Sequence, residues 1–229
     1  MSEGNEYIES IIAKMKEITY VQPGDVPNID LYMDQVTKFM DEYLESSKRY
    51  SDDKLLTKTM INNYTKNDLL PSPIKKKYSK DHMYMLLFIY YLKNILSISD
   101  TKAILSPLTE MFFEAERPQK EDKGVSLEQI YSEIFSIEKE QSYAITRDLV
   151  RKYEKSRTSF ADVPEGKEKD ILQAFAFISM MCFDVYMKKQ MIGKIIDDYF
   201  EEQPEEEDKD KKDKDKKDKD KKDKDKKDK

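Results

Sequence analysis

The sequence has no tryptophan, one cysteine, one histidine and only five glycines in 229 residues. Sheets with repeated turns need more glycine, so this shortage, together with twelve methionines, favours long helices. The lone Cys182 can form no internal disulfide, and since it lies in an apolar run we expect a buried thiol. The composition therefore predicts an all-α, or nearly all-α, cytoplasmic protein.

The shortage of histidine and cysteine also bears on catalysis. His82 and Cys182 lie about 100 residues apart, which is no metal-ligand spacing. No serine or cysteine is placed beside a base, and His82 is expected to be a packing or capping residue. We expect no enzymatic activity, no catalytic or metal-binding residues and no cofactor.

Long hydrophobic runs are missing too. Met83–Leu92 has ten residues, and Ile171–Phe183 has thirteen with Gln173 and Ser179 inside it. Each is shorter than the roughly 20 residues of a membrane-spanning helix, so both are predicted to be buried core helices. The N-terminus has no charged-then-apolar leader, so we expect neither secretion nor a membrane partner.

Apolar residues at helical spacing predict the organisation of the chain. Pro107 is expected to separate a helix of about 99–105 from a second one, and Ser126 with Gln129 resembles a capping box for a helix reaching about 155. We predict four segments: an N-terminal amphipathic helix and linker (1–29), a winged helix-turn-helix (30–105), a helical C-terminal and dimerisation region (106–203) and a disordered Asp/Lys tail (204–229). The tail, with twelve acidic residues and thirteen lysines from Glu205 to Lys229, is nearly neutral and is not expected to contact DNA.

One window is basic in an otherwise acidic chain. From Lys48 to Lys80 there are nine basic and three acidic residues, a net charge of +6, although the whole chain carries −6. Everything outside the window therefore sums to −12. Concentrated positive charge attracts a duplex phosphate backbone, so the window predicts a DNA-binding site.

The start of this window predicts a recognition helix. At 100° per residue Thr59, Asn62, Asn63 and Lys66 share one stripe, and Ile61 with its apolar neighbours lies opposite. Asparagine can pair with adenine in the major groove, while threonine and lysine reach phosphates or thymine methyl groups. The alternative is an ordinary solvated face, and the three lysines 75–77 after a Pro-x-Pro turn favour DNA.

The stretch MINNYTKNDLLPSPIKKKYS, followed by an apolar helix and ISDTKAIL, resembles the winged helix-turn-helix of MerR-type transcription regulators. It is similar, over about 30–105, to bacterial domain-of-unknown-function family 1836, itself suspected of regulating transcription. The resemblance implies that Leu69-Leu70-Pro71 forms the turn, Lys75–Tyr78 the wing and Ile98-Ser99 the final cap. The DNA-binding residues we predict are Lys58, Thr59, Asn62, Asn63, Tyr64, Lys66, Lys75, Lys76, Lys77 and Tyr78.

The chain departs from the MerR pattern at two places. Asn62 and Asn63 precede a single tyrosine where those regulators usually have arginine before a tyrosine pair, and Asp68 replaces the glycine of the turn. Both departures bear on which DNA sequence is read. The C-terminal half has no cysteine set for metal sensing and no recognisable effector pocket, so no effector ligand is inferred.

The sequence thus predicts a transcription regulator that binds double-stranded DNA through a recognition helix in the major groove and a wing on the backbone. Regulators of this kind read half-sites about one helical turn apart, so we expect a homodimer with the helix at 168–200 as the contact. The competing hypothesis is a helical protein-interaction module without DNA binding, in which the lysines dock an acidic partner and a methionine-rich face forms a groove.

Overall fold

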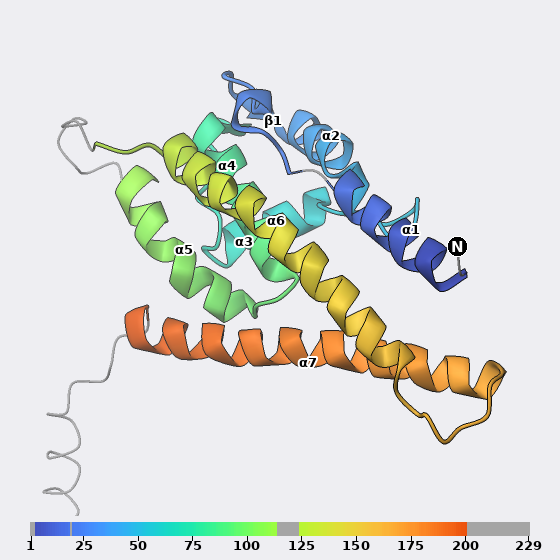
Figure 1. The fold of residues 1–229 in the computed structure, drawn as a ribbon. Coiled ribbons are helices and arrows are strands. Elements are labelled where there is room, and N and C mark those ends of the chain that lie inside the picture. Colours follow the sequence, from blue (N-terminus) through green and yellow to red (C-terminus); the bar gives the residue numbers. More distant parts are fainter. Residues whose placement is uncertain (1–2, 19, 114–123, 201–229) are drawn as a thin grey trace, which may run out of the picture.

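The computed structural model describes residues 3–18, 20–113 and 124–200 and shows a mostly helical chain (Figure 1). The predicted tail at 204–229 lies outside the described residues. The elements are α1 (Glu3–Glu17), β1 (Leu31–Tyr32), α2 (Met33–Tyr43), α3 (Lys58–Lys66), β2 (Lys77–Tyr78), α4 (Lys80–Lys93), α5 (Ile98–Phe113), α6 (Leu127–Arg157) and α7 (Lys167–Tyr199), with short 3₁₀ turns at Pro23–Asp25 and Glu45–Ser47.

The chain forms a head and an arm, defined here as residues 21–135 and 136–199. Helix α6 begins against the head, runs out of it, and returns as α7, so that the two long helices form a hairpin (Figure 1). The C-terminal part of α7 passes beside α5 of the head, and α1 packs on α6. The capping box predicted for α6 is confirmed: the Ser126 N–H donates to Gln129 Oε1 at 2.7 Å, and the Gln129 N–H donates to Ser126 Oγ at 3.2 Å.

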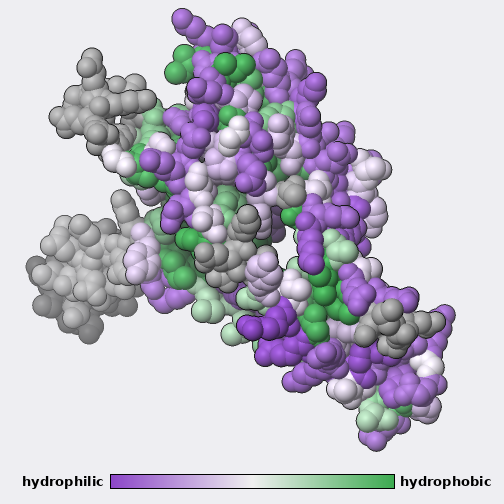
Figure 2. Space-filling view, turned by 45° about the horizontal axis from the view of Figure 1, so that its top comes forward, coloured by the Kyte–Doolittle hydropathy of each residue, from purple (hydrophilic) through white to green (hydrophobic). Residues whose placement is uncertain are grey.

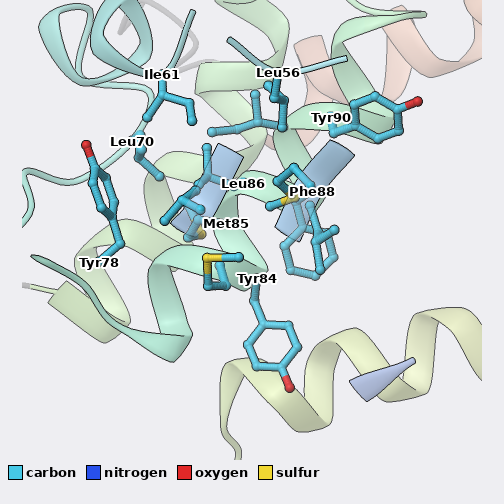
Figure 3. Packing of buried hydrophobic residues seen from close by; sticks show 14 of the residues in the cluster. Leu56, Ile61, Leu70, Tyr78, Tyr84, Met85, Leu86, Phe88 and Tyr90 are labelled. Carbon is cyan, nitrogen blue, oxygen red and sulfur yellow. The ribbon is translucent and has the colours of Figure 1, made fainter. Parts of the chain in front are cut away.

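Helix α4 is the centre of the head, as its all-round hydrophobic sequence predicts. All nine residues from His82 to Tyr90 are buried. Side chains from the segments around it, among them Leu56, Ile61, Leu70 and Tyr78, point into the same cluster (Figure 3). Helix α3 and the segment around β2 are therefore fixed to one another through a shared core.

Two tyrosines close the head at its N-terminal edge. The Tyr131 hydroxyl of α6 donates to the carbonyl oxygen of Val21 at 2.7 Å, and the Tyr84 hydroxyl of α4 donates to that of Pro23 at 3.2 Å. Burial raises the pKa of both phenols, so they remain protonated donors at neutral pH. The hydrophobic cluster accordingly extends from Val21 to Phe135, beyond both ends of the predicted 30–105 segment.

His82 completes the cap at the start of α4. The Ser79 N–H donates to His82 Nδ1 at 3.1 Å, and the Ser79 hydroxyl lies 2.8 Å from the same nitrogen. The ring is 2% exposed and packs edge-on against Tyr78 and Phe113. Burial lowers the pKa of His82, more than the backbone of Ser72 and the charges of Asp81 and Asp30 counteract, so the neutral ring is the native form.

We predict that this histidine makes the head sensitive to acid. Because the folded pKa lies below the ordinary value of 6.5, the unfolded state takes up the proton first and stability falls as pH drops below 6.5. In His82→Gln the amide oxygen can still accept from Ser79 N–H but does not titrate. Urea unfolding at about pH 7.5 and about pH 5 should show a larger loss for the wild type, by about 1.4 kcal/mol for each unit of lowered pKa. Equal losses in both proteins would assign the acid sensitivity to other groups.

Four predictions about α5 and α7 are wrong. Helix α5 runs unbroken from Ile98 to Phe113 with Pro107 inside it, because proline removes only one backbone donor and packing against the head holds the rest. Its first turn is capped by Ser97, whose hydroxyl accepts from the Asp100 N–H at 3.0 Å, and not by Ser99. The run Ile171–Phe183 is no buried core helix, and the thiol of Cys182 is exposed, because only one side of α7 is covered.

A second, smaller core holds the arm together. Ile8 of α1, Leu149 of α6 and Phe177 of α7 are buried against one another. Lys152 of α6 pairs with Asp148 on its own helix and with Asp184 of α7. These contacts fix which side of α7 faces α6.

Candidate nucleic-acid interface

Helix α3 has one buried face and one exposed face, as its sequence predicts. Ile61 and Tyr64 point into the core. The Thr57 hydroxyl caps the first turn by accepting from the Met60 N–H at 3.2 Å. The exposed residues on the outer face are Thr59, Asn62, Asn63 and Lys66. No hydrogen bond engages the side chains of Asn62 and Asn63 within the described part of the chain, so their amide groups are available to a ligand.

Helix α3 ends at Lys66, five residues before Pro71, earlier than proline alone would require. Asp68 has a φ of 54°, a left-handed conformation, and the N–H groups of Leu69 and Leu70 both turn back to the carbonyl oxygen of Tyr64, at 2.9 and 3.2 Å. A non-glycine residue in this region costs about 1 kcal/mol or more. Asp68 therefore occupies a strained position at the end of α3.

The lysine-rich segment forms the tip of a tight hairpin. The Ile74 N–H donates to Lys77 O at 3.1 Å and the Lys77 N–H donates to Ile74 O at 2.9 Å, which leaves Lys75 and Lys76 as a two-residue loop. Strand β2 then pairs antiparallel with β1, with Tyr78 opposite Leu31 and Lys77 opposite Tyr32. Residues 74–78 thus form a short hairpin, and we refer to them as the wing.

The wing loop is strained at both of its central residues. Lys75 has a φ of 50° and Lys76 a φ of 65°. Two-residue hairpin loops with two positive φ angles are type I′ turns, which strongly prefer Asn-Gly or a similar pair. Two lysines there cost roughly 1 kcal/mol or more each. Strain of this kind concentrates at functional sites, so the lysines point to a role other than stability.

Ion pairs divide the basic window into a neutralised part and a free part. Lys48 pairs with Asp41 at 2.8 Å, Lys80 with Glu128 at 2.7 Å, and Lys58 with Asp34. Described carboxylates form no ion pair with the other basic residues of the window, which are Arg49, Lys54, Lys66, Lys75, Lys76 and Lys77. The free positive charge therefore includes the C-terminal turn of α3 and the whole wing.

Two of the predicted contact residues belong to the core. Tyr64 is 9% exposed and Tyr78 is 3% exposed, and burial raises the pKa of both phenols. Their rings anchor α3 and the wing from behind, so we leave them out of the proposed interface. Lys58 is exposed, but its ammonium group already has Asp34 as a partner.

Tyr32 is a candidate contact that sequence reasoning missed. Its ring is more than half exposed, and Lys77 Nζ lies 5.4 Å from its centre in a cation–π arrangement. The neighbour relation comes from the pairing of β1 with β2, which are 45 residues apart in the chain. A two-residue strand has no periodicity, so no local pattern could have indicated it.

Comparison with known proteins finds one family. A family described as a domain of unknown function (DUF1836) matches residues 21–135, about half of the chain. The matched segment has the same limits as the hydrophobic cluster of the head, which runs from Val21 to Phe135. No curated protein and no solved structure matches the chain.

Proposed function

The chain belongs to the DUF1836 family, and we propose that the head shared with this family binds double-stranded DNA as a transcription regulator. Helix α3 enters the major groove and the wing lies on the phosphate backbone. The observation behind the proposal is the wing loop, where two exposed lysines occupy a turn that their residue type disfavours.

The order of elements supports a winged helix-turn-helix of the MerR kind. Strand β1 leads into α2, α3 follows, and the wing pairs back onto β1 before the core helix α4. This arrangement places an exposed polar helix and an exposed basic hairpin on one scaffold, each anchored in the same hydrophobic cluster. A rigid scaffold of this kind suits the positioning of contacts on a duplex.

The residues divide into two chemical roles. Asn62 and Asn63 offer donor and acceptor atoms side by side, which can pair with adenine edges. Lys66 and the lysines of the wing are point charges for phosphates, and Thr59 can serve either group. Lys58 is a weaker candidate than the sequence indicated, since binding phosphate would compete with its ion pair to Asp34.

The salt dependence of duplex binding tests the proposal. With about four phosphate contacts per bound chain, the logarithm of the association constant for random-sequence duplex should fall by roughly 3.6 per tenfold rise in salt concentration. Fluorescence anisotropy of a labelled duplex, titrated over a range of salt, measures the slope. No binding at low salt would overturn the proposal and favour the protein-interaction module. If binding is found, selection of bound genomic fragments would identify the operator.

A further inference from the structure

We propose that the N-terminal half of α7 forms an antiparallel, two-fold interface with a second copy of this chain. The surface consists of apolar side chains that nothing in the described structure covers. Phe175 is 67% exposed, and Ile171, Ile178, Val185 and Tyr186 are each more than half exposed. Figure 2 shows a patch of hydrophobic side chains on the arm among mainly hydrophilic ones.

The exposed residues repeat with the spacing of a coiled coil. Steps of four and three residues alternate along one stripe, which consists of Ile171, Phe175, Ile178, Cys182, Val185, Lys189, Ile192 and Ile196. A 3.5-residue repeat keeps its side chains facing a partner helix. In the C-terminal half, Ile196 of the same stripe is 2% exposed, and α7 there lies against α5 of the head. No described segment of the chain covers the N-terminal half of the stripe.

The opposite side of α7 is already used. Gln173 Nε2 donates to the carbonyl oxygens of Arg157 and Ser159, at 2.8 and 3.2 Å, and Phe177 is buried in the core of the arm. Asp184, the single charged residue between Ile171 and Met187, pairs with Lys152 of α6. These contacts fix the rotation of α7, so the stripe cannot turn inward.

The size of the patch fits a dimer. At roughly 100 Å² of exposed area per side chain, which is about half the full area of an aromatic residue, the five residues more than half exposed on or beside the stripe offer roughly 500 Å² per chain. A two-fold dimer would then bury about 1,000 Å², the least that a specific interface needs. Along the N-terminal half of the stripe the coiled-coil flanking positions are Leu172, Ala174, Ser179, Met181 and Tyr186, and the first charged residues on the stripe and its flanks, Lys188 and Lys189, come after it, so no like charges oppose self-association there.

The position of α5 selects the antiparallel orientation. Leu96 and Asp100 line a hollow together with Lys189 and Gly193, and the next stripe residue, Ile192, is half-buried, so the head covers this side of α7 from Ile192 onward. In a parallel dimer both copies of α5 would lie between the two α7 helices and force them apart. In an antiparallel dimer the layers pair Ile178 with the partner's Cys182 and Phe175 with the partner's Val185. A large side chain then meets a small one in these two layers, and the same register places Ile171 opposite the partner's Lys189.

A lipid surface is the main rival occupant. Helix α7 is, among the described residues, the one helix long and apolar enough to cross a membrane by length and composition, and 11% of its most apolar window is buried. The coiled-coil spacing and the side fixed against α6 favour a second helix. The interface stands on the geometry of α7 alone and does not rest on DNA binding.

The first test is the oligomeric state of the full chain in detergent-free buffer. Sedimentation equilibrium should give a dimer for the wild type, and a monomer for Phe175→Glu/Ile178→Glu. The matched control is Tyr143→Glu, which places one acid on an isolated side chain of α6 that is 84% exposed, and it should remain dimeric. Circular dichroism verifies that each variant stays helical. A monomeric wild type, or a dimer that survives the double substitution, would overturn the interface, and so would a monomer that floats with lipid vesicles.

Disulfide trapping tests the orientation. In the antiparallel dimer Cys182 faces the partner's Ile178, so Ile178→Cys should give covalent dimers on mild oxidation, and Ile178→Cys/Cys182→Ser should give far fewer. The wild-type Cys182 has no cysteine opposite it and should stay largely uncrosslinked. Rapid disulfide formation in the wild type, with no gain from Ile178→Cys, would overturn the antiparallel arrangement.

Discussion

Replacing Lys75, Lys76 and Lys77 with glutamate should weaken the binding of duplex DNA by about 100-fold or more per bound chain near 0.1 M salt. These lysines are exposed or half-buried, and described carboxylates form no ion pair with them, so their positive charge is free to neutralise phosphates. Reversal removes three such contacts and adds repulsion. The slope of affinity against salt concentration should fall by about three as well. Fluorescence anisotropy of a labelled duplex measures both quantities.

A control of equal charge separates the wing from net electrostatics. Lys211→Glu/Lys212→Glu/Lys214→Glu in the charge-repeat tail changes the net charge by the same amount. We expect this variant to bind nearly as the wild type does. Equal losses in the two triple variants would show that binding depends on overall charge, and would remove the wing from the proposed interface.

Long periodic segments were predictable from sequence. The all-round hydrophobicity of α4, the outward stripe of α3 and the capping box of α6 are local patterns, and local patterns determine which face of a helix is buried. The errors arose where coverage depends on a distant element. Ile171–Phe183 is apolar enough for a core helix, yet α6 covers only one of its sides and leaves Cys182 exposed.

The candidate interface was predictable in outline but not in detail. The excess of lysine indicated the basic window at 48–80. Which of its lysines remain unpaired depends on acidic residues elsewhere in the chain, such as Asp34 and Glu128. Burial of Tyr64 and Tyr78 and the placement of Tyr32 beside Lys77 likewise follow from tertiary packing. The strain in the wing loop cannot be predicted from composition, because it depends on the backbone conformation that the β1–β2 pairing imposes.

That strain allows stability and binding to be changed in opposite directions. In Lys75→Asn/Lys76→Gly the loop receives the pair that a type I′ turn prefers. The free energy of unfolding should rise by roughly 1–2 kcal/mol, because glycine has no Cβ penalty at positive φ and asparagine has a smaller one than lysine. The affinity for duplex should fall about tenfold, because two phosphate contacts are lost. Urea unfolding and anisotropy on one protein preparation measure both.

Lys77→Gln separates charge from strain. Lys77 follows the loop, where the backbone is not left-handed, so this substitution should weaken DNA binding without raising stability.

Two outcomes for Lys75→Asn/Lys76→Gly would contradict the argument. If this variant is no more stable than the wild type, the loop does not have type I′ geometry. If it binds DNA as tightly as the wild type, the wing has no role in binding. If it is both more stable and weaker in binding, the two lysines lower the stability of the fold for the benefit of binding. That opposition is what a site positioned for a phosphate backbone predicts.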